Sequence, residues 1–230
     1  MCGRATLITP VDEIAEAFGV APIPIGPPRF NISPGTDLLV IRSDPARDAH
    51  GELALLRWGL VPAFAKDRKI GHRLAQARAE TLTKVNTFRF AFEKRRCLVV
   101  VDGFYEWSGE GKSRQPHYVH LSDRSPFTMA GLWERWTSAE GDTLQTCAVV
   151  TTPSRAALGE LHDRMPLILG EGREREIWLG GSAEEARSVL EGAHDAVAHT
   201  LVLETVSTWV NNTRHDDPRC IEPIGENALC

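Results

Sequence analysis

Short apolar runs recur along most of the chain, separated by clusters of glycine, proline, aspartate and asparagine. The clearest run spans residues 97–101 and is followed by Asp102-Gly103, a pattern typical of a buried strand that ends in a turn. The same pattern predicts strands at 3–8, 38–41, 53–58, 104–108, 118–121, 127–136, 143–151, 167–169 and 200–206. Because these strands do not alternate regularly with helices, we predict an α+β fold, predominantly antiparallel, with curled sheets or an open barrel and peripheral helices.

Helical periodicity is confined to a few segments. An amphipathic helix is predicted at 11–18, where Pro10 can start it, and the basic segment 66–96 is predicted to be mostly helical. Pro153 and a Ser154 cap predict a helix at 154–161, and two more are expected at 173–179 and 183–190. The proline-rich stretch 22–28 reads as a loop.

Composition is that of an ordinary globular protein, since 42% of the 230 residues are hydrophobic and 25% are charged. We expect a single domain over residues 2–230, with Met1 removed. The apolar runs are too short to span a membrane and no signal peptide is evident, so a cytoplasmic protein is expected. The five cysteines are scattered, which argues against disulfides and structural zinc. We expect no metal, no cofactor and a monomer.

Charge is distributed unevenly. The chain has a net charge of −5, yet ten basic and three acidic residues give the segment 66–96 a charge of +7. A local basic face, rather than the overall charge, sets the attraction for phosphate. The alternative is a solvated helix face with ordinary charge pairs.

Cys2 follows the initiator methionine, and loss of Met1 would leave a terminal residue with both an amine and a thiol. The amine can condense with an aldehyde to an imine, and the thiol can then close a five-membered thiazolidine. Both groups are only partly in their reactive forms at neutral pH, so a nearby acid/base group would be needed. The alternative is an ordinary frayed terminus.

Four further places carry candidate chemistry. Phe64, in a loop beside Lys66, could stack on a base. Trp58 and Pro62 lie at the end of a strand, and for Trp58 we favour packing in the core. Arg78, near Gln76, could clamp a phosphate or pair with Glu80.

Glu106 is flanked by Tyr105 and Trp107, and aromatic surface would raise its pKa toward the range useful for acid/base catalysis. A solvent-facing strand glutamate is the alternative. His162, at a helix end, could be tuned by Asp163 or Arg164, or could simply cap the helix.

In their order, these motifs resemble the SRAP family of abasic-site processing proteins, the SOS-response-associated peptidases. The resemblance covers nearly the whole chain, and its motifs are 1–4, 30–34, 58–62, 77–81, 96–98, 102–107, 162–166, 210–211 and 221–224.

The resemblance implies that Cys2 captures the aldehyde of an abasic site in single-stranded DNA as a covalent thiazolidine, with AP-lyase and autoproteolytic side activities. It implies that Glu106 is the acid/base group and that His162 assists imine chemistry. Gln76 stands where the family usually has asparagine, and Phe64 where it usually has tryptophan. The residues expected to contact DNA are Arg4, Trp58, Pro62, Phe64, Lys66, Arg73, Arg78 and Arg89.

Three alternatives remain open from the sequence. A terminal cysteine also serves N-terminal-cysteine amidotransferases and related hydrolases, and a thiol with His162 could form a peptidase. Phe64 and the basic segment alone could form a non-catalytic module that binds single-stranded DNA without a covalent product.

Overall fold

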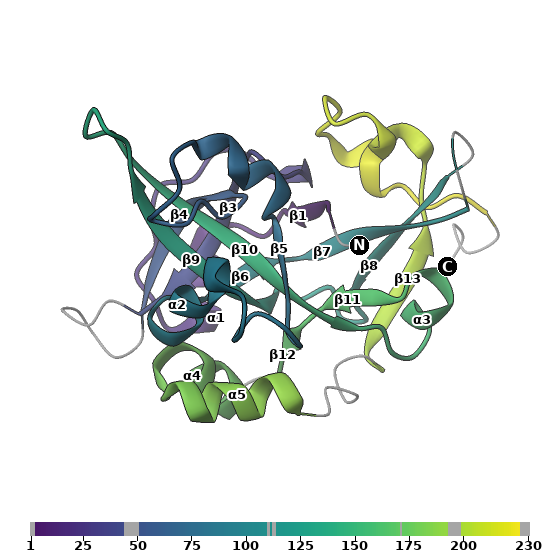
Figure 1. Ribbon diagram of the computed structural model, residues 1–230. Coiled ribbons are helices and arrows are strands. Elements are labelled where there is room, and N and C mark those ends of the chain that lie inside the picture. The colour runs from purple at the N-terminus through teal and green to yellow at the C-terminus, as the bar shows by residue number, and fades with distance from the viewer. Residues whose placement is uncertain are drawn as a thin grey trace.

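Two β-sheets lie side by side in the computed structural model, with helices around them (Figure 1). The structure describes residues 3–43, 51–109, 111, 114–170, 172–192 and 199–225. The predicted α+β class with antiparallel curled sheets is confirmed.

The larger sheet closes into a ring. Its strands are β3 (Asp37–Arg42), β4 (Glu52–Trp58), β6 (Arg96–Val101), β9 (Phe127–Thr137) and β10 (Thr143–Pro153), and β10 returns to pair in parallel with β4. Three short strands extend it: β5 (Gln76–Arg78) and β11 (Arg164–Pro166) pair with β10, and β12 (Ile168–Leu169) pairs with β9. The predicted open barrel is therefore closed by the β10–β4 pairing.

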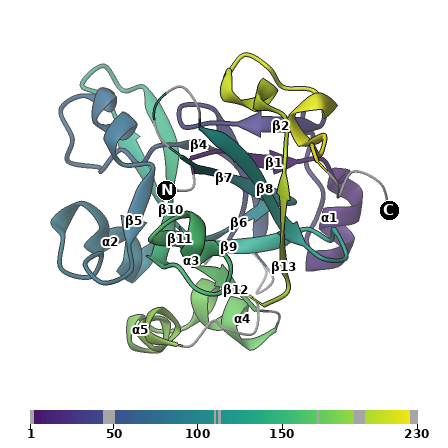
Figure 2. The same cartoon turned by 90° about the vertical axis from the view of Figure 1, so that its right-hand side faces the viewer.

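The smaller sheet has the strand order β13 (Leu201–Thr205), β8 (Gln115–Leu121), β7 (Gly103–Ser108), β1 (Ala5–Leu7) and β2 (Arg29–Ile32). It faces the viewer in Figure 2. The chain passes from β6 of the barrel to β7 of this sheet through Asp102. The Asp102 carboxylate accepts hydrogen bonds from the Ile8 and Thr9 backbone and from the Thr9 hydroxyl, which fixes β1 beside this crossing.

Five helices surround the sheets among the described residues: α1 (Val11–Phe18), α2 (Asn86–Lys94), α3 (Leu158–Leu161), α4 (Arg173–Gly180) and α5 (Ala183–Glu191). Arg96 is buried and its guanidinium donates to the carbonyl oxygens of Phe92, Trp178 and Gly181, which ties α2 and α4 to the start of β6. The motif at 96–98 therefore has a structural role. No helix in the described part of the chain is long and apolar enough to cross a membrane.

Two helix predictions are wrong. The basic segment is mostly not helical, because it contains a 3-10 helix at Arg68–Arg73 and the strand β5 before α2 begins. Helix α3 starts at Leu158 rather than at residue 154, because β10 runs on to Pro153, the Ser154 backbone donates to the Asp163 carbonyl, and Ala156 has φ +50°. Strand β2, which follows the proline-rich loop, was not predicted.

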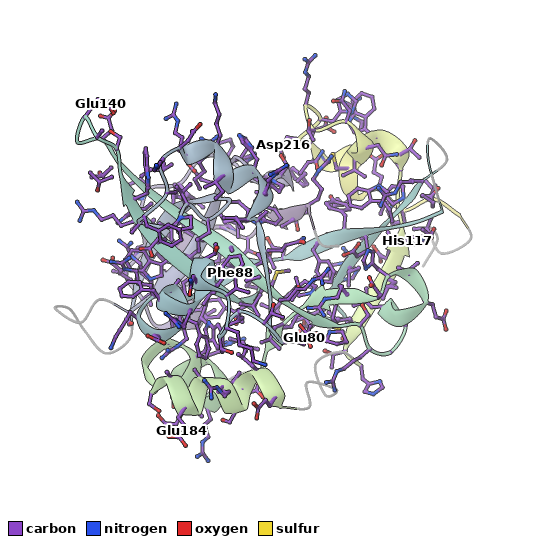
Figure 3. The ribbon with its side chains drawn as sticks, viewed as in Figure 1. Glu80, Phe88, His117, Glu140, Glu184 and Asp216 are labelled. Atoms are coloured by element: carbon purple, nitrogen blue, oxygen red, sulfur yellow. The ribbon has the colours of Figure 1, made fainter. Side chains whose placement is uncertain are left out.

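The segment 207–224, which we call the C-terminal strap, contains two 3-10 helices, Thr208–Asn211 and Pro218–Ile221. Asn31 donates through its side chain to the carbonyls of Val210, Asn212 and His215. Asp216, a residue of the strap labelled in Figure 3, accepts hydrogen bonds from the Arg29 guanidinium and from the Phe30 and Asn31 backbone of β2. The strap is therefore fixed to one face of the smaller sheet.

Candidate active site

Glu106 lies on β7 and is 0% exposed. Burial raises its pKa to about 7, with the Arg114 charge opposing the rise and the Asp163 charge supporting it. A carboxyl group with such a pKa can both give and accept a proton at neutral pH.

The aromatic neighbours of Glu106 point away from it, because successive side chains of a strand face opposite sides of the sheet. The Tyr105 hydroxyl donates to the Phe30 carbonyl, and the Trp107 indole donates to the Asn211 side chain at 2.7 Å, both on the strap side. Glu106 is buried rather than facing solvent, but its aromatic neighbours, contrary to the prediction, do not provide its cover.

Arg4 joins β1 to β7. Its carbonyl accepts from the Tyr105 N–H at 3.1 Å, so Gly3 lies beside the Tyr105–Glu106 step of β7. Cys2 is bonded to Gly3 but lies outside the described residues.

The Arg4 guanidinium is on the strap side. It donates to the Asn31 side chain at 2.7 Å and to the Val210 carbonyl at 2.8 Å, and it lies 5.7 Å from the centre of the Trp107 ring. Burial lowers its pKa. These contacts give Arg4 a structural role in holding the strap.

His162 follows α3, which packs against β7. Its Nδ1 lies 2.7 Å from an Asp163 carboxylate oxygen and 3.0 Å from the Arg164 backbone N–H. A neutral ring can accept from Arg164, whereas a proton on Nδ1 favours Asp163. Burial lowers the pKa of His162 and the Asp163 charge opposes this. Arg114 and Asp163 influence the pKa values of both His162 and Glu106, which places the two side chains in one electrostatic environment.

Arg164 connects this region to β10 and the turn after β5. Its guanidinium forms an ion pair with Glu80, labelled in Figure 3, and donates to the carbonyl and the hydroxyl of Thr151. The hydrogen bond from Arg164 lowers the pKa of Glu80. Glu80 therefore pairs with Arg164 rather than with Arg78.

Gln76 and Arg78 lie on β5, opposite Val149 and Thr151 of β10. Both line a cavity of about 390 Å³, here called the β5 cavity, together with Pro34, His72, Arg73, Ala75 and Thr151. Because Thr151 also pairs with Pro166 of β11, the β5 cavity lies one strand away from the segment that carries His162. The structure thus brings Gln76, Arg73 and Arg78 together.

The expectation that Trp58 and Pro62 contact DNA is wrong for this structure, because both are buried. Trp58 is 1% exposed and its indole donates to the Ala75 carbonyl at 2.8 Å, so it has no face for a base. Phe64 is 69% exposed, and Lys66 beside it is also exposed. Arg89 is exposed on α2 and does not line the β5 cavity.

Sequence reasoning missed the cross-strand neighbours of Glu106. His117 on β8 lies opposite Glu106, and its ring nitrogens are 2.8 Å from the Ser108 hydroxyl and 3.3 Å from the Thr205 hydroxyl. Burial lowers the pKa of His117. Only the β7–β8 register reveals this neighbour, and the sequence does not specify that register.

Comparisons with known proteins agree on one family. Residues 1–213 match the family described as SOS response associated peptidase (SRAP). The chain is 36% identical over 226 residues to the abasic site processing protein YoqW of Bacillus subtilis, covering 96% of this chain and 99% of that protein. It is 30% identical to the abasic site processing protein HMCES of Xenopus tropicalis, covering 86% of this chain and 66% of that protein.

Solved structures show the same fold. A crystal structure of a Bacteroides thetaiotaomicron protein superposes with a TM-score of 0.83 at 23% identity, covering 97% of this chain and all of that one. A phage-related protein from Bordetella bronchiseptica superposes with a TM-score of 0.69 at 26% identity, covering 89% of this chain and 94% of that one.

Proposed function

Because the chain belongs to the SOS response associated peptidase (SRAP) family, we propose that it processes abasic sites in single-stranded DNA through a covalent bond to Cys2. Relatives over nearly the whole chain are named abasic site processing proteins. An abasic site carries an aldehyde in its ring-opened form, which is the group that a terminal amine and thiol capture together.

The observation that carries the proposal is the position of Glu106. Its buried carboxyl has a pKa of about 7 and lies on β7 beside Gly3. Gly3 is bonded to Cys2, and consecutive Cα atoms are about 3.8 Å apart. An acid/base group therefore stands beside Gly3, whose neighbour in the sequence would carry the reactive amine.

The reaction forms two bonds and releases one water. After Met1 is removed, the Cys2 amine adds to the aldehyde carbon, and Glu106 transfers protons as the aldehyde oxygen leaves in water and an imine forms. The thiol sulfur then bonds to the imine carbon and its proton moves to nitrogen, which closes the thiazolidine.

A slower closure leaves time for a competing path. The imine acidifies the neighbouring carbon of the sugar, and loss of a proton there expels the 3′ phosphate in a β-elimination. His162 shares the electrostatic environment of Glu106 and is the second group able to move a proton at the sugar oxygen. We therefore assign AP-lyase activity as a side reaction of the same site.

The strand itself would be held by the exposed side of the barrel. Arg73 and Arg78 line the β5 cavity with Gln76, and Phe64 presents an exposed ring nearby in the sequence. Phosphate contacts of this kind position a strand without reading its bases, and they weaken as salt rises.

The test incubates the purified protein with a single-stranded oligonucleotide that carries one abasic site, followed by a denaturing gel. A heat-stable crosslink is expected for the wild type and none for Cys2→Ala, while Cys2→Ser should retain an imine that borohydride traps. Cys147→Ala is the matched control, because that thiol is buried in the barrel and burial raises its pKa. Normal crosslinking by Cys2→Ala would refute the proposal.

Removal of Met1 is a separate requirement. Mass spectrometry of the purified protein should show a chain that starts at Cys2. A variant that retains one residue before Cys2 should not form the thiazolidine, and full crosslinking by it would show that a free Cys2 amine is not needed.

A further inference from the structure

A second cavity, of about 270 Å³, opens at the end of β4 and is lined by basic side chains. We call it the basic pocket and define it by Arg57, Arg68, Lys69 and His72. The described residues that line it include no aspartate or glutamate. Its lining also includes Gly35 and Gly59, where the backbone itself forms the wall.

The cations of the basic pocket differ from the arginines of this protein that form ion pairs. Arg42, Arg164 and Arg219 each have a carboxylate within 4 Å. Within the described part of the chain, no carboxylate lies within 4 Å of the side-chain nitrogens of Arg57, Arg68 or Lys69. Like charges that converge without a counter-charge repel each other, and an anion bound between them removes that cost.

The frame beneath these cations is fixed by a close contact between two glycines. A Cβ on Gly59, whose φ is +128°, would lie 2.7 Å from the Gly71 carbonyl oxygen, and a Cβ on Gly71 would lie 2.6 Å from that of Gly59. Hydrogen bonds from Leu60 N–H to the Leu74 carbonyl and from Leu74 N–H to that of Gly71 hold the same contact. The 3-10 helix Arg68–Arg73 is therefore held against the end of β4 in one orientation.

The basic pocket adjoins the β5 cavity. His72 lines both, and the adjacent residues Pro34 and Gly35 line one each. A strand whose phosphates contact Arg73 and Arg78 at the β5 cavity therefore reaches Arg68 and Lys69 by passing His72.

We propose that the basic pocket binds a backbone phosphate of the DNA strand several nucleotides away from the lesion. The assignment rests on the proposed function for its choice of ligand, but it concerns a different place on the molecule from the Cys2 site. It extends the contact surface from the β5 cavity across Arg68 and Lys69 to Arg57.

The experiment measures fluorescence anisotropy of undamaged single-stranded oligonucleotides of about 5 and about 20 nucleotides. The double variant Arg68→Ala/Lys69→Ala is expected to weaken binding of the long strand on the order of tenfold and to leave the short strand nearly unchanged. Loss of this phosphate contact should also reduce the salt slope by about 0.7, the value per neutralised phosphate for single strands.

A matched control removes the same charge elsewhere. The double variant Arg173→Ala/Arg187→Ala replaces one arginine on α4 and one on α5, the helices at the lower end of the molecule in Figure 1. Equal loss of affinity in both double variants would mean that net charge alone acts, and it would overturn the proposal. An unchanged salt slope in Arg68→Ala/Lys69→Ala would overturn it as well.

The basic pocket could bind a free phosphate ion instead of a phosphate of the DNA backbone, and inorganic phosphate is the probe that tests this alternative. If the Arg68→Ala/Lys69→Ala variant loses inorganic phosphate binding but keeps full affinity for the long strand, the assignment to a DNA strand is wrong. The proposed function is tested separately, by measuring the yield of the crosslink to a short abasic strand. The Arg68→Ala/Lys69→Ala variant should form this crosslink at the wild-type yield. A wild type that forms no crosslink would refute the proposed function and leave the binding result for undamaged strands valid.

Discussion

Replacing Glu106 by glutamine keeps the size of a fully buried side chain and removes its charge. Burial raises the pKa of this carboxyl from 4.5 to about 7. Each unit of pKa shift corresponds to about 1.4 kcal/mol, so the ionised form costs the folded protein about 3 kcal/mol. That cost is a large fraction of the stability of an ordinary domain.

The cost depends on pH in a definite direction. Below the unfolded pKa both states bind the proton and no cost arises. Between pH 4.5 and 7 the unfolded state loses its proton first, so the cost grows, and above pH 7 it is fully present. The free energy of unfolding of Glu106→Gln minus that of the wild type should therefore be about 3 kcal/mol larger at pH 8 than at pH 4.

The assay is urea denaturation of both proteins at pH 4, 6 and 8, with the free energy of unfolding extrapolated to water. The same variant should crosslink an abasic strand at least about 100-fold more slowly, since general acid/base groups contribute that much or more. Its affinity for undamaged single strands should be unchanged. Glu106→Asp is the matched control, because it retains a carboxyl group on the same strand.

A stability difference between Glu106→Gln and the wild type that is the same at pH 4 and pH 8 would refute the reasoning. It would mean that Glu106 does not titrate between these values in the folded protein. Equal losses of crosslinking and of affinity for undamaged DNA would instead make Glu106 a structural residue.

The remaining predictions concern binding and stability. Phe64→Ala should weaken binding of undamaged single strands by about 1–3 kcal/mol, measured by anisotropy, with an unchanged melting temperature because the ring is 69% exposed. Trp58→Phe should instead lower the free energy of unfolding in urea by about 0.5–1.5 kcal/mol, because it removes the indole hydrogen bond to the Ala75 carbonyl, to which the Val149 N–H still donates, while strand affinity stays unchanged. Asp216→Ala should speed hydrogen exchange in the C-terminal strap, and equal acceleration in the barrel would show that the strap does not unfold separately.

Sequence patterns predicted those parts of the fold that local signals determine. Strand β6 is a continuous apolar run and helix α1 has clear apolar periodicity, and both form where expected. Strand β5 has no such signal, because the tripeptide 76–78 becomes a strand only through pairing with the distant β10. The helix prediction over 66–96 is wrong because long-range contacts shape this segment: Gly71 packs against Gly59, and 76–78 pairs with β10.

The candidate site was predicted as a set of residues rather than as an arrangement. Glu106 is buried as expected, but Tyr105 and Trp107 lie on the other face of the sheet. Arg4 binds the strap, and Glu80 takes Arg164 as its partner, neither of which is visible in the order of residues along the chain. These outcomes depend on which face each strand turns toward the barrel.

In the proposed function, the division of the molecule into two sheets separates strand binding from chemistry. The carboxyl of Glu106 belongs to β7 of the smaller sheet, whereas the basic side chains of the β5 cavity and the basic pocket belong to the barrel and the connection 59–85. His162 lies between α3 and β11, and α3 packs against β7, the strand that carries Glu106. Substitutions on the connection should therefore change affinity without altering the pKa of Glu106, and substitutions around β7 should do the reverse. A variant such as Arg68→Ala/Lys69→Ala that shifted the pH dependence of crosslinking would show that the two sheets are coupled.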